Sequence, residues 1–557
     1  MAQDQDGATR KVLFYVPGLA IGPDKSGPLL ERLRAEYGSD WEIHVFRHGV
    51  RPWTLYPRLG QAVDRLAVAI ASASGDFTGE AHTVGEVRLM GHSLGGLLIQ
   101  SAYLRGLGVD GNQSSSTVGS WASKVRRMVL VGTPNQGFAP RRMPFTARLT
   151  YAFASPFWDF AAEAFRMGGY WITNLRLLWM ETLRGQANPP LVVQVLGTDD
   201  DFIHEEDVRD SINMPNTGWT HMDGANHPGL VDLGDPFTSE YRWKVLREAL
   251  FGSSIKPQAA SPVSERPVHF IVHGIRASAY DTWVQQLKAE IEHDPDGVEP
   301  YVVAMDYGYL SAYEFALPFS RNRKTHTFLT TYANACRDFN PDNFNFAGHS
   351  NGTFMMGRAM KLVPAVRFRH IFLAGSVLPV DYRWSALFAR RQVGRHDSTG
   401  LWLRGRVHND RAAVDVPVGI LATFLHGLHP FNKDIGPGGY RGFSEDSLPA
   451  EVSDHELAFP PGHGSALMDH PGQPPRMPQI SHYLRSGVPV CTPDTVRPAK
   501  FALMNRLVER LAWFLVLLIV VLLLLAGWWL ATVLGLWWAV GIYAAVLGGA
   551  YVALRCI

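Results

Sequence analysis

Two serines stand in the same local pattern, and this pattern suits nucleophilic chemistry. Ser93 lies in the sequence Gly-His-Ser-Leu-Gly and Ser350 in Gly-His-Ser-Asn-Gly. Each follows a short apolar run typical of a buried strand and precedes an apolar run typical of a helix. Small residues around the serine allow a sharp turn between strand and helix, which leaves the hydroxyl exposed at the end of the strand. Such a serine can attack a carbonyl, provided that a base removes its proton.

The two serine motifs belong to two regions built on one plan. The first region begins with Val12–Gly18 and the second with Val268–Gly274, each predicted to be a buried strand that ends in a glycine turn. The glycine turn precedes Ser93 by nearly the same number of residues as it precedes Ser350. The stretch Ser253–Pro267 is rich in Pro, Ser and Ala, which is typical of a linker.

On these motifs, both regions resemble the α/β-hydrolase superfamily, and the first resembles its lipase and esterase members. The resemblance implies an α/β fold class: two tandem α/β-hydrolase domains, each a mostly parallel sheet flanked by helices, followed by two transmembrane helices. In this superfamily the catalytic residues follow one another in the order serine, acid, histidine. The resemblance covers nearly everything before the apolar C-terminal segment.

In the first domain, Ser93 is the predicted nucleophile and the acid is expected after the strand Leu191–Leu196. The sequence Gly-Thr-Asp-Asp-Asp follows that strand, and the superfamily pattern selects Asp200. Asp199 and Asp201 stay open as alternatives, because the count can be off by one.

The predicted base of the first domain is His227, in the turn Gly-Ala-Asn-His-Pro-Gly-Leu. His221 and His204 are competing histidines with structural or surface roles. The backbone N–H groups of Leu19 and Leu94 are expected to form the oxyanion hole. Residues from about 140 to 188 are rich in aromatic side chains and are predicted to form an apolar lid over an acyl-binding pocket.

In the second domain, Ser350 is the predicted nucleophile, with the N–H groups of Ile275 and Asn351 as its oxyanion donors. Asp415 is chosen as the acid because Asp-Val-Pro-Val resembles the sequence after an acid turn, and Asp410 remains open. The predicted base is His463.

His482 is the alternative base of the second domain. Proline-rich turns surround His463, and the acid is ambiguous. A second domain without catalytic activity is therefore a further hypothesis.

The C-terminal segment is long enough to cross a membrane twice. Leu511–Leu554 carries no charged residue, and a helix of about 44 residues would be about 66 Å long, twice the hydrocarbon thickness of a bilayer. We expect transmembrane helices at 510–530 and 536–555, separated by a break near Gly535. Basic residues occur on both sides of the hairpin, which by the positive-inside rule places both ends, and the catalytic domains, in the cytoplasm.

The chain is expected to divide as follows: a disordered N-terminus, residues 1–10; the first hydrolase domain, 11–252; a linker, 253–266; the second domain, 267–490; a basic juxtamembrane segment, 491–509; and the two spans. Lys and Arg number 52 against 51 Asp and Glu, so nothing points to a nucleic-acid partner. The three cysteines are far apart, which excludes a disulfide framework or a zinc ribbon.

These features together predict a multi-pass membrane serine hydrolase that cleaves lipid or acyl-ester substrates through an acyl-enzyme, with two active sites. Neither a cofactor nor a metal is required. Two alternatives remain: a membrane scaffold with one or both domains inactive, and an acyltransferase or thioesterase that uses the same triad. The sequence leaves the substrate and the oligomeric state open.

Overall fold

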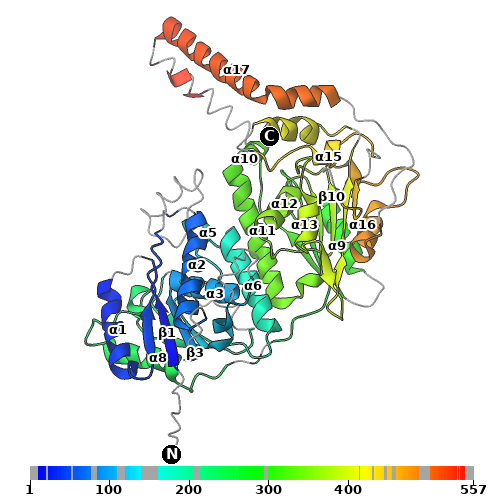
Figure 1. Cartoon of the computed structure of the whole chain (residues 1–557). Coiled ribbons are helices and arrows are strands. Elements are labelled where there is room, and N and C mark those ends of the chain that lie inside the picture. The colour runs from blue at the N-terminus through cyan, green and yellow to red at the C-terminus, as the bar shows by residue number, and fades with distance from the viewer. Residues whose placement is uncertain are drawn as a thin grey trace, which may run out of the picture. The chain divides into compact units, whose positions relative to one another are not determined.

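The computed structural model describes most of the chain, and its residues fall into two compact units, Met1–Pro262 and Val263–Ile557 (Figure 1). The described residues are 10–19, 23–51, 54, 56–76, 84–109, 119–139, 161–201, 203–204, 214–257, 259, 261–293, 299–412, 414–428, 432–444, 448–454, 459–488, 502–535, 537, 540–542 and 544–545.

The first unit is built on a six-stranded parallel sheet. Its strands, in chain order, are β1 (Arg10–Val16), β2 (Glu42–Val45), β3 (Val84–His92), β4 (Val125–Val131), β5 (Leu191–Gly197) and β6 (Thr217–Met222). Their spatial order is β2-β1-β3-β4-β5-β6. The central strands are apolar on both faces, as expected where helices cover both sides of a parallel sheet.

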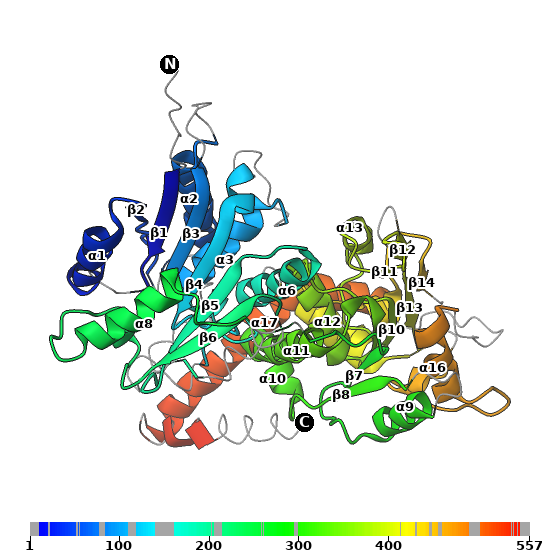
Figure 2. The ribbon, with the colours of Figure 1, turned by 90° about the horizontal axis from the view of Figure 1, so that it is seen from below.

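Helices cover both faces of this sheet (Figure 2). They are α1 (Pro23–Tyr37), α2 (Tyr56–Ala73), α3 (Leu94–Gly106), α5 (Ala161–Ala164), α6 (Tyr170–Gly185) and α8 (Ser239–Phe251), with short 3-10 turns at Ser120–Lys124 and Pro228–Leu230. Side chains of α1 and α8 pack with the sheet into one hydrophobic core. On the other face, α3 packs against α2 and α6.

The second unit repeats this architecture. Its strands are β7 (Val268–Val272), β8 (Tyr301–Met305), β9 (Phe344–His349), β10 (His370–Ala374), β13 (Arg406–Asp410) and β14 (Val452–Asp454), in the spatial order β14-β13-β10-β9-β7-β8. Read from the other edge, this order matches that of the first unit strand for strand. The structure therefore confirms two α/β units with parallel sheets.

The helices of the second unit also lie on both faces of its sheet. The helices of this unit are α9 (Thr282–Glu292), α10 (Ala312–Ala316), α11 (Pro318–Asp338), α12 (Asn351–Leu362), α13 (Trp384–Ala389), α14 (Thr423–Gly427), α15 (Gly438–Arg441), α16 (Arg476–Ser486) and α17 (Ala502–Leu534), the last of which packs on α14. Shorter helical turns lie at Pro341–Asn343, Pro417–Ala422 and Ser465–Leu467. One core joins α9 and α16 to the sheet, while α11 packs against α12.

One segment of the second unit is divided between two sheets. The stretch Leu401–Val407 splits at Gly405 into β12 (Trp402–Arg404), which pairs with β11 (Gly394–His396), and β13, which joins the main sheet. A side chain on Gly405 would collide with the carbonyl oxygen of Arg369. The backbone of Gly405 thus passes too close to a neighbouring segment for any other residue type.

The predicted boundaries shift by a few residues. Arg10, placed in a disordered N-terminus, is the first residue of β1. The last part of the predicted linker belongs to the second unit, because Ser264 exchanges backbone hydrogen bonds with Asp338 and Asn340. Residues 1–9 and 489–501 lie outside the described residues.

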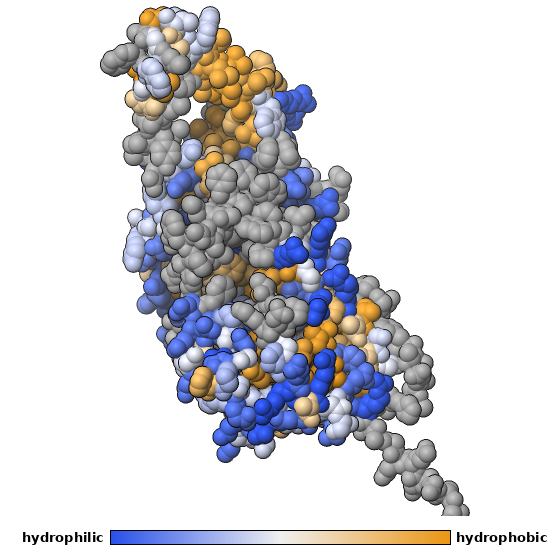
Figure 3. Space-filling view, turned by 90° about the vertical axis from the view of Figure 1, so that its left-hand side faces the viewer, coloured by the Kyte–Doolittle hydropathy of each residue, from blue (hydrophilic) through white to orange (hydrophobic). Residues whose placement is uncertain are grey.

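Among the described residues, one helix is long and apolar enough to cross a membrane. This is α17, with an apolar stretch at Arg506–Val533. Its apolar side chains are exposed over most of its length and form a hydrophobic patch at the top of Figure 3. Helix α17 ends at Leu534, and the next residue, Gly535, has a φ of 80°, which is common at the C-terminal end of a helix. Most of the predicted second span, 536–555, lies outside the described residues, so the hairpin stays a prediction.

The helix α17 begins earlier than the predicted span at 510–530. It takes in the second half of the segment predicted to be a basic juxtamembrane stretch. The reason is local packing: Ala512 is fully buried, and its Cβ and the carbonyl of Glu509 lie against Gly427 of α14. Residues 509–512 thus pack on the folded unit, and the helix continues on the N-terminal side of its apolar part.

Candidate active site

Ser93 lies at the turn between β3 and α3, in a backbone conformation that serine rarely adopts. Its φ and ψ are 53° and −121°. A strained residue of this kind costs about 1–3 kcal/mol and persists only where the surrounding structure holds it. Here the backbone N–H of Ser93 donates to the carbonyl of Val131 at 2.8 Å, and its carbonyl accepts from the N–H of Gly96 at 3.0 Å.

Glycines make room for this turn. A Cβ on Gly95 would overlap with the carbonyl oxygen of Val16, at the end of β1. A Cβ on Gly18 would lie 2.8 Å from the Cβ of Ser93. The glycine turn after β1 therefore lies directly against the serine.

A chain of hydrogen bonds connects Ser93 with His227 and Asp200. The Nε2 of His227 lies 2.9 Å from the Oγ of Ser93, and its Nδ1 lies 2.8 Å from Oδ2 of Asp200. The other carboxylate oxygen of Asp200 accepts from the N–H of Ile203 at 2.9 Å. The Asp200 side chain is 1% exposed and that of His227 is 21% exposed, so the carboxylate is buried while the imidazole reaches solvent.

Topology explains how residues far apart in sequence meet here. Ser93, Asp200 and His227 follow β3, β5 and β6, and the carboxyl ends of parallel strands lie at one edge of the sheet. Asp199, an alternative acid, is exposed, and the hydroxyl of Thr198 lies 3.5 Å from its Oδ1. Asp201 is also exposed, and His221 lies half-buried within β6. The structure brings only Asp200, of the three aspartates, to His227.

His92 supports the histidine turn, a role that sequence reasoning missed. Its Nε2 lies 3.0 Å from the carbonyl oxygen of His227, and its ring is fully buried. Burial lowers the pKa of His92 to about 3, so the ring is neutral and its Nε2–H can donate to that carbonyl. The signal was present in the sequence, because a histidine precedes both serines.

The predicted oxyanion donors lie beside Ser93. Leu94 is the first residue of α3, where N–H groups have no acceptor within the helix. Leu19 directly follows Gly18, whose Cα lies against Ser93. Both backbone N–H groups thus belong to segments that flank the hydroxyl.

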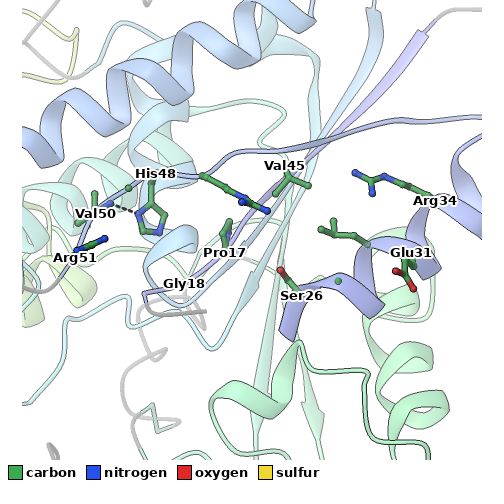
Figure 4. A pocket seen from close by; sticks show the side chains of 13 residues that line it. Pro17, Gly18, Ser26, Glu31, Arg34, Val45, His48, Val50 and Arg51 are labelled. Carbon is green, nitrogen blue, oxygen red and sulfur yellow. Dashed lines mark hydrogen bonds between the residues drawn. The ribbon is translucent and has the colours of Figure 1, made fainter. Parts of the chain in front are cut away.

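A cavity of about 490 Å³ adjoins this turn (Figure 4). Pro17 and Gly18 form part of its wall, and Figure 4 shows Arg34 and Glu31 on one side and His48 and Arg51 on the other. The pKa of His48 is lowered, mainly by burial. Its Nδ1 accepts a hydrogen bond from the N–H of Val50 at 2.9 Å. The lining carries more basic than acidic side chains, because it holds Arg34, Arg47 and Arg51 against the single carboxylate of Glu31.

The predicted lid falls partly outside the described residues. Nothing is described of residues 140–160, where many of its aromatic side chains lie. The later part includes α6, which is buried against α3. The rings of Trp179 and Tyr103 pack edge to face, with 6.0 Å between their centroids. This helix is part of the body of the unit, and a lid role remains a prediction for the residues before it.

The second unit repeats most of this geometry. Ser350 has φ and ψ of 53° and −120° between β9 and α12, and a Cβ on Gly274 would lie 2.9 Å from its Cβ. The Nδ1 of His463 lies 2.8 Å from Oδ2 of Asp415, whose Oδ1 accepts from the N–H of Val418 at 3.0 Å. The acid and the base that the sequence selected are therefore in contact.

One link of the second site is absent. Among the described residues, the Nε2 of His463 has no hydrogen-bond partner, although the atom is buried. Its position is otherwise supported as in the first unit, since Nε2 of His349 lies 3.1 Å from its carbonyl oxygen. Ser350 is therefore not engaged by its base as Ser93 is.

Asp410, the alternative acid of the second unit, has a structural contact instead. Arg476 of α16 donates to its Oδ2 at 2.6 Å, and His408 lies 2.9 Å from its Oδ1. Although burial alone would raise the pKa of Asp410, His408 and Arg476 lower it, so the carboxylate is ionised. The pair attaches α16 to β13. The alternative base His482 is exposed on α16.

The predicted oxyanion donors of the second unit are Ile275, after Gly274, and Asn351, the first residue of α12. The buried Tyr307 holds this turn, since its hydroxyl lies 2.5 Å from the carbonyl oxygen of Gly274 and 3.0 Å from that of His273. Its ring stacks on that of His273, with 4.1 Å between the ring centroids.

Within the described part of the chain, no group of three or more His, Cys, Asp or Glu could hold a metal ion.

Comparison with known proteins finds similarity at the level of structure. Neither a protein-family model nor a curated protein matches this chain. Solved structures similar to part of it include the esterase Est1E from Butyrivibrio proteoclasticus, with 12% identity over 44% of this chain and 90% of that one and a TM-score of 0.27. The esterase Pf2001 of Pyrococcus furiosus has 13% identity over 44% and 85% of the two chains, with a TM-score of 0.27.

A third similar structure is the mouse α/β-hydrolase domain-containing protein 10, with 12% identity, 42% and 88% coverage and a TM-score of 0.26. These values are too low to indicate an activity or a substrate for this chain. The two parallel α/β units described above are consistent with the α/β-hydrolase fold.

The contact between Asp200 and His227 predicts which of the three neighbouring aspartates is needed for catalysis. In a chain that also carries Ser350→Ala, so that only the first site is measured, Asp200→Asn should lower the turnover of an activated ester by about 10,000-fold, because the imidazole loses the carboxylate that orients it. Asp199→Asn and Asp201→Asn are the matched controls and should keep the parent rate. Initial-rate kinetics on the three purified variants decide this, and a loss centred on Asp199 or Asp201 would contradict the geometry.

The two aspartates of the second unit should differ in what they affect. Asp410→Ala leaves Arg476 buried without its partner and should destabilise this unit by about 3–5 kcal/mol. Asp415→Asn should leave stability nearly unchanged and alter only the reactivity of Ser350. Urea denaturation of both variants measures the difference, and equal stabilities would show that the Asp410 pair is not structural.

Buried histidines should make stability depend on pH. Burial holds the pKa of both His92 and His349 at about 3, below the ordinary value of 6.5. Between pH 3 and 6.5, the range these two pKa values set, each histidine is protonated in the unfolded chain and neutral in the folded one. The free energy of unfolding therefore has its full value above pH 6.5 and decreases as the pH falls below it. Each histidine contributes a slope of about 1.4 kcal/mol per pH unit.

Urea denaturation between pH 4 and 6, a range set by these pKa values, measures this slope. His92→Gln keeps an amide donor but cannot titrate, and should reduce the slope of the first unit by that amount. An unchanged slope would mean that His92 is protonated in the folded chain.

Proposed function

We propose that this chain is a membrane-anchored serine hydrolase that cleaves ester bonds of lipid or acyl substrates. The observation that supports this most strongly is the continuous hydrogen-bonded chain from Ser93 through His227 to Asp200. A serine in a strained strand–helix turn, a histidine within hydrogen-bond distance of its hydroxyl and a buried carboxylate behind that histidine are the parts that acyl transfer requires.

The mechanism follows from these positions. Ser93 Oγ attacks the ester carbonyl while Nε2 of His227 accepts its proton, and the buried Asp200 stabilises the imidazolium that forms. The N–H groups of Leu19 and Leu94 donate to the oxyanion. His227 then protonates the leaving alkoxide, which leaves an acyl group on Ser93. Water, deprotonated by the same histidine, attacks the acyl-enzyme and regenerates the serine.

The substrate class is inferred from the surroundings of the site. The helix α17 would hold the chain at a membrane, where lipid esters are concentrated. We propose that the aromatic residues between 140 and 160 cover an acyl chain, and that the cavity beside Gly18, with its excess of arginine, receives a polar or anionic part of the substrate. The basic residues flanking the apolar segment favour a cytoplasmic location for both units.

The second unit is proposed to be a slower site of the same kind. Ser350 has the same strained turn, and the pair of Asp415 and His463 is formed, but the link from His463 to the serine is missing. In free enzymes catalytic hydrogen bonds are often long and tighten only when substrate binds. We therefore expect Ser350 to react, but more slowly than Ser93.

Hydrolysis of p-nitrophenyl esters of graded chain length tests this function on the full chain in a neutral detergent. Ser93→Ala should remove nearly all turnover and Ser350→Ala only a small part, because only Ser93 is engaged by its base. The double variant measures the background.

Three other results would change the proposal. Transfer of the acyl group to an added alcohol in preference to water would indicate an acyltransferase. Faster cleavage of thioesters than of esters would indicate a thioesterase. No turnover by the folded parent would leave a membrane scaffold.

A further inference from the structure

A second cavity, of about 570 Å³, lies in the second unit beside the C-terminal half of α12, the helix that follows Ser350. Its lining comes from the end of α12, the loop after β10, the helix α13 and the segment around His426 and Asp434. Its size is within the range of small-molecule sites. Neither Ser350 nor His463 lines it, so the cavity is separate from the proposed active site.

The charged lining of this cavity is mostly basic. It contains five arginine and lysine side chains and two aspartates: Arg358, Lys361, Arg383, Arg390, Lys433, Asp381 and Asp434. Asp434 forms ion pairs with Arg358 and Lys361 and is held in place by them. Although burial raises its pKa, these neighbours and Lys433 lower it, so this carboxylate is ionised.

After that internal pairing, three cations and one further carboxylate, that of Asp381, remain in the lining, so its net charge is positive. Within the described residues, Arg383, Arg390 and Lys433 form no ion pair, and all three side chains are exposed at the cavity. Guanidinium groups bind phosphate and carboxylate oxygens through two parallel hydrogen bonds, which makes such a cluster suited to an anion.

Apolar residues complete the wall. Leu362, Leu378 and Leu387 line the cavity together with the arginines. A free inorganic anion gains nothing from contact with apolar side chains. A ligand with an anionic head and an apolar part would contact both the basic and the apolar side chains. The lining thus favours an amphiphilic anion.

The cavity lies next to the start of the apolar helix. His426 lines it, and the Nε2 of His426 lies 3.9 Å from Glu509 of α17. Arg441 donates to the same carboxylate at 2.9 Å. The uncharged run begins at Leu511, two residues beyond Glu509. If α17 crosses a membrane, the cavity is within reach of the lipid headgroups.

We propose that this cavity binds the phosphate headgroup of an anionic membrane phospholipid, with Arg383, Arg390 and Lys433 as phosphate ligands. Basic pockets beside membrane helices are suited to such headgroups. The proposal rests on the proposed membrane anchoring and is independent of catalysis by Ser93. Binding there would hold the second unit against an anionic membrane surface.

The test uses the full chain in a neutral detergent and isothermal titration calorimetry. The probe is a short-chain, ether-linked phosphatidic acid, which an esterase cannot cleave. We expect saturable binding of one lipid per chain, and no binding of the ether-linked phosphatidylcholine of equal chain length. Arg383→Ala/Arg390→Ala should weaken the binding at least about tenfold, because two charge-assisted contacts are lost.

The matched control is Lys288→Ala/Arg404→Ala. It removes the same charge from two surface residues that do not line the cavity and whose ion pairs contribute little to stability. Its affinity should equal that of the parent. Thermal unfolding and ester hydrolysis of both variants are recorded in the same preparations, and both should stay at the parent level, which separates this site from the proposed function.

Three outcomes would overturn the proposal. Equal affinity of the two double variants would show that lipid binding does not use this cavity. Equal binding of phosphatidylcholine would indicate insertion into the micelle. Inorganic phosphate that binds as tightly as the lipid, with the same dependence on Arg383 and Arg390, would make the ligand a soluble phosphate.

Discussion

The strained backbone at Ser93 and Ser350 is the constraint on which both sites depend. A φ of 53° for a serine is unfavourable, and it is stabilised only because the strand before it and the helix after it are both fixed by packing. The same packing brings the glycine turn of the first strand against the serine, where a side chain would collide with it. The parallel sheet then delivers the acid and the histidine to this edge from its later strands. Each site is thus a consequence of sheet order more than of local sequence.

The two units show how closely one plan can be repeated and where it differs. Backbone angles, the contact between acid and histidine, and the support from a buried histidine agree in both. The single link that differs is the one between histidine and serine, which is formed in the first unit only among the described residues. Because a serine hydroxyl is a weak nucleophile without its base, this one contact separates a site prepared to react from one that must first rearrange.

Much of this arrangement could be predicted from the sequence, and the failures have physical reasons. The two parallel α/β units were expected from the resemblance that the repeated glycine turns and serine motifs carry. The choice between Asp410 and Asp415 was not determined by spacing, since only the fold shows that Arg476, far along the chain, occupies the first. The support from His92 was missed although a histidine precedes both serines, because its partner is a backbone carbonyl that only the fold brings to it. That α17 extends beyond the predicted span 510–530 on its N-terminal side could not be predicted, since hydropathy does not register packing against Gly427.

The most direct test of the account is to react the folded full chain with a fluorophosphonate and to locate the adduct by peptide mass spectrometry over time. The reagent modifies a serine only where a base activates it and an oxyanion hole receives its oxygen. The account predicts an adduct on Ser93 that forms first and reaches one per chain, with Ser350 modified more slowly. An absence of any adduct on Ser93, or modification of Ser350 before Ser93, would contradict it.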